Sequence, residues 1–292
     1  KEIEMKISDV IGKILDYHPK FPDDYAGCDG YKSGDPDAEC TGVVCALVPT
    51  VEVIRKTKEL GCNLLYVHEP TFYCSPDYPD WRAGFENRVY EEKKALLDEA
   101  GIAIWRDHDH AHAHNPDSIF TGVIKYLGWE EHQTGEELIP NTFASRFFEF
   151  EDMTVGKMNE MLKERLSLNG IRYIGRPEDT IRKVALVGHL FPMSGSEPVT
   201  VNGYCPEYST GNIKDMEEKG VDAIIPGEVI DWTVMSYIRD AVQLGKVKAA
   251  FNVGHFNLEE LGMKYAADWI SDLIGNELPV HYVPSGDIYR FA

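Results

Sequence analysis

Residues 41–70, TGVVCALVPTVEVIRKTKELGCNLLYVHEP, decide the fold. Residues 41–49 form a short apolar run that is typical of a buried strand, and residues 50–61 carry apolar side chains at helical spacing up to Gly61. Residues 62–70 form a second apolar run, which ends at a proline. The order strand, helix, strand is the building unit of α/β proteins, so this stretch predicts an α/β fold.

The same alternation extends to both ends of the chain. Apolar spacing predicts a helix over residues 5–17, a helix and a strand over 86–110, and a helix over 118–128. The second half repeats the pattern. We expect strands within residues 145–151, 181–188, 221–228, 246–254 and 279–284, and helices within 155–167, 211–220, 232–245 and 257–274.

The polar, irregular residues 129–148 separate the two halves. We therefore expect a first α/β lobe over residues 1–128 and a second over 129–292, with the C-terminal elements packing back on the first lobe. The stretch 189–208 is rich in Gly, Ser and Pro. Its length suggests the hypothesis of a flexible lid over a binding site.

Composition narrows the function classes. The chain has 292 residues, 43% of them hydrophobic, and 49 acidic against 29 basic side chains give a net charge of −20. Such a charge repels nucleic acid and anionic membranes, which we do not expect as partners. The six cysteines contain no C-x-x-C pair, no run spans a bilayer, and the start KEIEMKISDV lacks a signal-peptide core. These features predict a cytoplasmic protein.

Polar side chains of the kind that bind metals follow the apolar strands. In open α/β sheets ligands bind outside the carboxyl ends of strands, so these positions are the first candidates for a site. Residues 105–114, WRDHDHAHAH, place four histidines at every second position. The other strand-end positions hold His68 and Glu69, Glu228 and Asp231, and His255 and Glu259.

Each candidate has a structural alternative. His68 beside Glu69 is also consistent with a buried histidine next to a solvated acid. Asn257 and Glu260 have capping-box spacing, which would place Glu259 in a first helical turn beside His255, either as a ligand pair or as a helix terminus only. Glu228 fits a general base, a group that orients a ligand, or an acidic helix start.

The sequence leaves the backbone conformation of the histidine-rich stretch open. Extended backbone would align all four histidines on one side, whereas a helical turn would pair His108 with His112 and His110 with His114. We expect one or two of them to be metal ligands, and a solvated loop is the alternative. No phosphate-binding loop of the G-x-x-x-x-G-K type and no G-x-S-x-G motif occurs, so serine or cysteine nucleophilic chemistry is not indicated.

Six segments resemble successive blocks of the Nif-three-like dinuclear metal centre family, also known as the type 2 GTP cyclohydrolase I family. The resemblance covers nearly the whole chain. In order, the segments are GCDGYKSGDP, VVCALVPTVEVIRKTKELGCNLLYVHEPTF, GIAIWRDHDHAHAH, IRKVALVG, GVDAIIPGE and GHFNLEE.

The resemblance implies a set of metal ligands. Family members carry a His-His-Pro block, a His-Thr-Asn-Leu-Asp block and a Gly-His-x-x-x-Glu block. Here Glu69 replaces the second histidine of the first block, and His112 replaces the aspartate of the middle block. The two replacements keep three histidines and two carboxylates in total. The implied metal ligands are His68, Glu69, His112, His255 and Glu259, with His108 and Glu228 as candidate catalytic or orienting groups.

The resemblance also implies a function and an assembly. It implies two similar lobes with two divalent ions between them, zinc, iron or manganese, in a homohexamer. An imidazole bridges two ions only if it loses both ring protons, so Glu69 or Glu259 would take the bridging role. We expect a metal-dependent hydrolase acting on a small molecule, a phosphate ester or a nucleotide-like heterocycle. The alternatives are a metal-trafficking or adaptor assembly, and a scaffold whose centre is lost.

Overall fold

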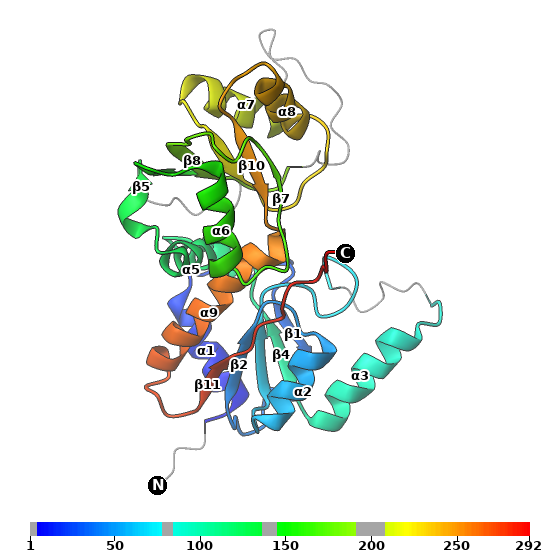
Figure 1. Ribbon diagram of the computed structural model, residues 1–292. Coiled ribbons are helices and arrows are strands. Elements are labelled where there is room, and N and C mark those ends of the chain that lie inside the picture. Colours follow the sequence, from blue (N-terminus) through cyan, green and yellow to red (C-terminus); the bar gives the residue numbers. More distant parts are fainter. Residues whose placement is uncertain (1–4, 78–83, 136–144, 191–207) are drawn as a thin grey trace. The chain divides into compact units, whose positions relative to one another are not determined.

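The computed structural model describes residues 5–77, 84–135, 145–190 and 208–292, which form two compact units (Figure 1). The first unit comprises Lys1–Val123 and Glu259–Gly286, and the second comprises Ile124–Leu258 and Asp287–Ala292. Each unit contains one mixed β-sheet with helices against it. This confirms the α/β fold class with two sheet-containing lobes.

The sheet of the first unit has the order β1-β4-β3-β2-β11. Residues 41–70 form its centre, because β2 (Val43–Ala46) lies parallel to β3 (Leu64–Val67) and α2 (Val51–Glu59) joins them. β4 (Ala103–Arg106) and β11 (Val280–Tyr282) are parallel to their neighbours, whereas β1 (Gly30–Ser33) runs antiparallel to β4. The carboxyl ends of β3 and β4 therefore lie side by side.

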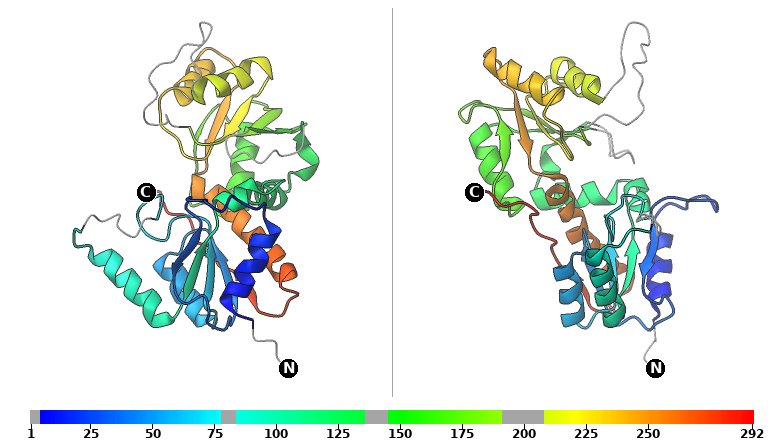
Figure 2. Two further views of the ribbon diagram at one scale, coloured as in Figure 1. Left: turned by 180° about the vertical axis from the view of Figure 1, so that it is seen from behind. Right: turned by 90° about the vertical axis from the view of Figure 1, so that its right-hand side faces the viewer.

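Helices cover both faces of this sheet. α2 and α3 (Arg88–Ala100) lie on one face, and α1 (Ile7–Tyr17) and the part of α9 (His255–Leu273) after Leu258 lie on the other (Figures 1 and 2). Alternate strand side chains such as Val44 and Leu65 pack in the core under α2 and α3. On the opposite face, the ring centroids of Tyr66 and Trp269 lie 6.0 Å apart. The sheet is thus buried on both sides.

Two glycines let helices of the first unit approach closely. A Cβ on Gly122 in α5 (Ser118–Leu127) would lie 2.8 Å from Gly262 Cα, and a Cβ on Gly262 in α9 would lie 2.8 Å from Ile119 Cα. Both distances are too short for a real side chain. The start of α5 and the segment of α9 after Leu258 therefore run in backbone contact, which fixes Glu259 relative to the chain that follows His112.

The second unit contains a sheet of order β5-β6-β8-β9-β10-β7. The three central strands, β8 (Lys183–Leu186), β9 (Ala223–Ile225) and β10 (Ala249–Asn252), are parallel. The outer strands β5 (Gln133–Thr134), β6 (Arg146–Glu149) and β7 (Arg172–Ile174) are antiparallel to their neighbours. α7 (Tyr208–Glu218) and α8 (Val234–Gln243) share a core with one face, and α6 (Val155–Arg165) lies on the other (Figure 2).

Several local features differ from the sequence-based expectations. The short strands β1, β5 and β7 and the five-residue helix α4 (Asp109–Ala113) were not predicted, because each is shorter than a periodic pattern can reveal. The proposed cap at Asn257 is wrong. α9 already begins at His255, and the Asn257 side chain donates from Nδ2 to Val253 O at 2.8 Å instead of accepting a helix N–H.

Residues 191–207, which make up most of the stretch suggested as a lid, lie outside the described residues. In the described part, Cys28, Cys40, Cys45, Cys62 and Cys74 are free thiols. None of the helices among the described residues combines the length and apolar character needed to span a membrane.

Candidate metal centre

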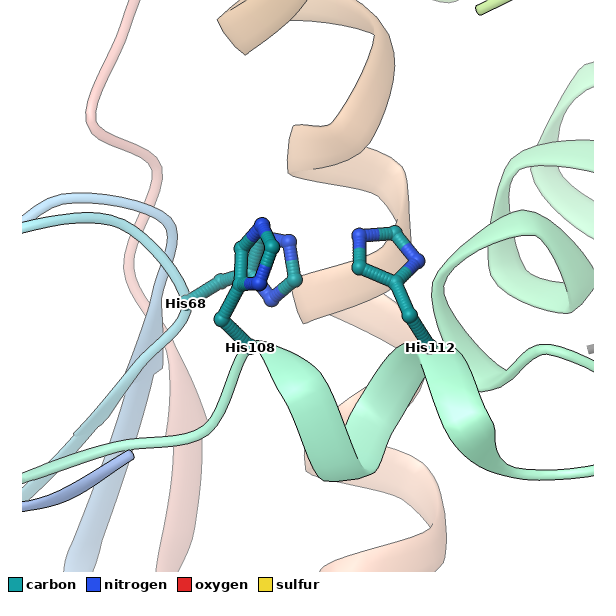
Figure 3. Close-up of side chains that lie close together, drawn as sticks. All are labelled: His68, His108 and His112. Carbon is teal, nitrogen blue, oxygen red and sulfur yellow. The ribbon is translucent and has the colours of Figure 1, made fainter. Parts of the chain in front are cut away.

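Three histidines of the first unit come together at the carboxyl end of its sheet. His68 follows β3, His108 follows β4, and His112 lies one turn further on α4 (Figure 3). Each offers a ring nitrogen, and these atoms all lie within 4.8 Å of one another. The ring centroids are 4.6 Å apart for His68 and His108, 4.8 Å for His68 and His112, and 4.9 Å for His108 and His112.

The partners of the three Nδ1 atoms set the ring orientation. His68 Nδ1 donates to Asp107 O at 2.9 Å, His108 Nδ1 to Asp109 Oδ1 at 2.8 Å, and His112 Nδ1 to Asp117 Oδ2 at 2.9 Å. An oxygen acceptor requires the proton on Nδ1, so the lone pair of each neutral ring lies on Nε2. This arrangement is typical of metal-binding histidines. The three histidines therefore offer three nitrogens that can each bind a metal ion, all within 4.8 Å of one another.

Glu259 adds a carboxylate from α9. Its Oε2 lies 3.3 Å from His68 Nε2, and His68, Glu69 and Glu259 form a second group with ligand atoms within 4.8 Å. The His68 side chain is fully buried, and its Nε2 makes no hydrogen bond among the described residues. Buried polar atoms normally have a partner, so this nitrogen fits a bound cation. His68 is the residue that the two groups share.

Glu69 has a second neighbour that bears on its role. The buried guanidinium of Arg106 lies 3.8 Å from Glu69 Oε2 and 3.7 Å from Asp77 Oδ2, and it donates to His68 O at 3.0 Å. Arg106 therefore offsets part of the negative charge of Glu69 and Asp77. Glu69 therefore lies close to both this cation and His68.

Asp29 shapes the start of α4. Because β1 pairs antiparallel with β4, the residue before β1 lies beside the residues after β4. Asp29 Oδ1 accepts from the N–H groups of His108 at 2.7 Å and Asp109 at 3.0 Å, and Oδ2 accepts from the N–H and Nδ1 of His110 at 2.9 and 2.6 Å. This side chain, which is 1% exposed, holds the helix turn that carries His108 and His112.

The pKa values of the two neighbouring aspartates follow from these contacts. Burial alone would raise the pKa of Asp29, but the hydrogen bonds from His110, His108 and Asp109 hold it below its usual value. The hydrogen bond with His108, opposed by burial, holds the pKa of Asp109 below its usual value as well. Both carboxyls are thus ionised acceptors at neutral pH.

The other two histidines of the stretch pack against aromatic rings. His110 stacks on Phe21 with centroids 3.9 Å apart, and His114 stacks on Tyr17 at 4.4 Å. His114 Nδ1 also lies 3.3 Å from Nδ1 of the buried His18. Of the four histidines in residues 105–114, His108 and His112 therefore belong to the group with His68, whereas His110 and His114 pack against aromatic side chains.

The predicted residues His255 and Glu228 lie in the second unit. His255 Nδ1 is 3.2 Å from Glu228 Oε1, which again leaves the lone pair on Nε2. The ring of His189 lies 4.5 Å from that of His255, and His189 Nδ1 accepts from the N–H of Glu228 at 3.0 Å. A Cβ on Gly227 would lie 2.5 Å from His189 Nδ1, so the contact needs glycine there.

Three residues of these networks were missed in the sequence: Asp29, Asp117 and His189. His189 follows β8 in VALVGHL, the same strand-end position that drew attention to His68, and could have been found by the same rule. His189 accepts at Nδ1, so its proton lies on Nε2 and the neutral ring presents a donor there. Asp29 and Asp117 carry no such signal, because their role depends on contacts that only the fold creates.

We predict that Asp117→Asn weakens metal binding more than it weakens the fold. Asp117 Oδ1 accepts from the N–H groups of Ile119 and Phe120 at 3.0 Å, and asparagine caps helices as well as aspartate does. The amide cannot provide the negative charge that pairs with His112. We expect a fall of about 10- to 100-fold in metal affinity, measured by competition with a chromophoric chelator, with a change in unfolding free energy below about 1 kcal/mol. Equal metal affinity in both proteins would contradict the role assigned to Asp117.

Comparisons with known proteins agree with this architecture. A family model described as Duf34/NIF3 (NGG1p interacting factor 3) matches residues 5–189. A Clostridium perfringens protein named GTP cyclohydrolase 1 type 2 homolog is 25% identical over 262 residues, which cover 87% of each chain. The structure of a Bacillus cereus protein related to NIF3 has a TM-score of 0.70 at 16% identity, covering 98% of this chain and 99% of that one. A hypothetical protein of Staphylococcus aureus has a TM-score of 0.69 at 16% identity, covering 99% of both chains.

Proposed function

The chain belongs to the Duf34/NIF3 family, and from this premise we propose that it is a metal-dependent hydrolase with two divalent ions. The observation that carries the proposal is the group of His68, His108 and His112, whose Nδ1 atoms are all held by oxygen acceptors. Three imidazoles that share this arrangement and a small volume match the donor set of transition-metal sites.

We propose His68, His108, His112 and Glu259 as metal ligands. We also propose His255, as the family resemblance implies. His108 has the same Nδ1 arrangement as the other two histidines, so we assign it a ligand role in place of the proton-carrier role expected from the sequence. Glu69 is a further ligand whose charge Arg106 offsets. Zinc, iron and manganese all suit a set of imidazoles and carboxylates.

The residues around the ligands have separate tasks. Asp109, Asp117 and Glu228 accept the Nδ1 protons of His108, His112 and His255, which fixes each ring and makes its Nε2 more basic. When bound, two divalent ions would supply Lewis acidity that lowers the pKa of a water molecule and offsets negative charge on a substrate oxygen. We also propose Glu228 as a proton acceptor in the reaction.

We propose a small molecule as the substrate, a phosphate ester or a nucleotide-like heterocycle. The net charge of −20 disfavours long polyanions, whereas two cations would offset the repulsion of a single small anion. The Clostridium perfringens relative is named as a homologue of a GTP cyclohydrolase, which supports the same substrate class. The hexameric assembly stays a prediction from the family resemblance, and the cytoplasmic location stays a prediction from the sequence.

The metal-trafficking alternative requires spare histidines that pass a metal to the centre. The rings of His110 and His114 stack on those of Phe21 and Tyr17. These contacts favour a packing role for both histidines and therefore favour the hydrolase.

The first experiment is the metal content per chain, measured by elemental mass spectrometry on tag-free protein, together with turnover of p-nitrophenyl phosphate and of its diester. We expect about two ions per chain, fewer in Glu69→Ala and His112→Ala, and turnover that falls with the metal content. Two ions without turnover on a broad panel of phosphate esters and heterocycles would favour metal trafficking. Fewer than one ion per chain, unchanged in both variants, would refute the dinuclear centre.

A further inference from the structure

The second unit contains a pocket of about 540 Å³ that is formed by its own residues. The volume lies in the range of small-molecule sites and is too small for a polymer. Its wall combines two arginines, two amides and the His255–Glu228 pair with aromatic side chains near the C-terminal end of the described chain. The polar lining residues that matter here are Arg172, Glu228, Asn252, His255, Asn257, Asp287 and Arg290.

The pocket lies where an α/β sheet binds ligands. Glu228 follows the parallel strand β9, and residues 253–255 follow β10. β7 runs antiparallel to β10, so it begins at the same edge, and its first residue Arg172 is paired with Asn252. The pocket is therefore at the carboxyl ends of parallel strands. A guanidinium and a carboxamide enter it from neighbouring strands.

The two acidic side chains of the pocket are hydrogen-bonded, whereas its two arginine side chains make no such contact within the described part of the chain. Glu228 binds His255, and Asp287 accepts from the N–H groups of Asn169 and Tyr289 at 3.1 Å each and from Asn257 Nδ2 at 3.3 Å. The guanidinium groups of Arg172 and Arg290 make no hydrogen bond or ion pair among the described residues. The pocket lining thus contains two arginines that no carboxylate pairs with among the described residues, together with the two carboxylates of Glu228 and Asp287.

The segment that carries Arg290 is anchored on both sides. Asn169 Nδ2 donates to Tyr289 O at 2.8 Å. The Phe291 ring lies on Gly170, where a Cβ would be 2.6 Å from Phe291 Cδ2. These contacts hold the backbone of Arg290 beside the loop that leads to Arg172. A smaller hollow of about 260 Å³ shares Arg172 and Asn252 and adds Asp231 and Arg239. Arg239 Nε lies 3.9 Å from Asp240 Oδ1.

We propose that this pocket binds the phosphate-bearing part of a small molecule, with Arg172 and Arg290 as its cationic contacts and Asn252 as a neutral donor. Guanidinium groups match the geometry of phosphate oxygens and stay charged at all physiological pH values. The inference extends the proposed function and rests on it for the reaction, because His255 and Glu228 line the same pocket. Anion binding itself does not require the metal ions.

The test uses phenylphosphonate, whose C–P bond is not hydrolysed, with isothermal titration calorimetry on the full chain at low ionic strength. We expect Arg172→Met and Arg290→Met each to weaken binding about tenfold or more, as loss of a charge-assisted contact implies. The matched control is Arg165→Met, an exposed arginine of α6 outside the pocket, which should bind as the wild type does. Benzoate, a planar monoanion, should bind more weakly than phenylphosphonate.

The metal-depleted variant His112→Ala separates this inference from the proposed function. Retained phenylphosphonate binding in His112→Ala, with loss of binding in the arginine variants at unchanged metal content, supports the pocket even if no hydrolase activity is found. Binding that is lost in His112→Ala and unchanged in both arginine variants overturns the inference, because the anion then binds the metal ions. Equal affinity for benzoate and phenylphosphonate overturns the assignment to phosphate.

Discussion

His68→Ala is expected to lower metal affinity more than any other single substitution in the chain. His68 is the residue common to the histidine group and to the group with Glu69 and Glu259. Its Nε2 is buried and lies 3.3 Å from Glu259 Oε2, so its loss removes a direct donor from both groups. The fall should exceed the roughly 10- to 100-fold that loss of an outer hydrogen-bond partner costs.

Two measurements check this prediction. Metal affinity is obtained by chelator competition. A thermal unfolding scan with and without EDTA should show a melting temperature that depends on metal in the wild type and not in His68→Ala, because a cation that binds only the folded state stabilises it. The matched control is His132→Ala, since His132 lies in the second unit and donates to Glu149 O at 3.0 Å. Wild-type metal affinity in His68→Ala would refute the centre described here.

Among the substitutions proposed here, Asp29→Ala is expected to lower the free energy of unfolding most. The substitution leaves three N–H groups at the start of α4 and the Nδ1 of His110 without their acceptor, in a place where the Asp29 side chain is 1% exposed. Removing one partner of a buried, hydrogen-bonded charge costs about 3 to 5 kcal/mol. That is a large part of the stability of an ordinary domain, about 5 to 15 kcal/mol.

Chemical denaturation followed by circular dichroism measures the effect of Asp29→Ala. Asp37→Ala provides the surface control, because the exposed pair of Asp37 Oδ1 with Lys6 Nζ at 3.2 Å should contribute about 1 kcal/mol or less. Metal affinity should fall together with stability in Asp29→Ala, since α4 carries His112. A stability loss equal to that of the surface control would show that α4 forms without Asp29.

Two residues that are not among the implied ligands account for the ligand replacements that the family resemblance implies. A histidine at position 112 needs an acceptor for its Nδ1 proton, and Asp117 supplies it from the start of α5. A glutamate at position 69 brings a buried charge, and Arg106 lies 3.8 Å from it. Each replacement therefore has a compensating partner within the first unit. A metal site whose ligands have been exchanged needs such partners to remain stable. Their presence supports the metal-binding proposal.

The sequence by itself determined the α/β fold class and the strand-end positions that hold the candidate ligands. Both are local properties. Apolar periodicity reports which segments bury a face, and strands that run parallel bring the residues after them to one edge. His68 and His108 were found in this way, because β3 and β4 are neighbours in the sheet. His189 was accessible to the same reasoning.

Only the tertiary structure decided which histidines of residues 105–114 converge. The repeat of every second residue is compatible with an extended chain or with a helical turn, and nothing within it chooses between them. Asp29, which lies 79 positions before His108 in the sequence, stabilises the helical turn by accepting the N–H groups at the start of α4. One helical turn then places His112 beside His108 and turns His110 toward Phe21. A contact between distant residues has no signature in a local pattern. The spacing of the histidines therefore identified the stretch, and only the family resemblance implied His112 as a ligand within it.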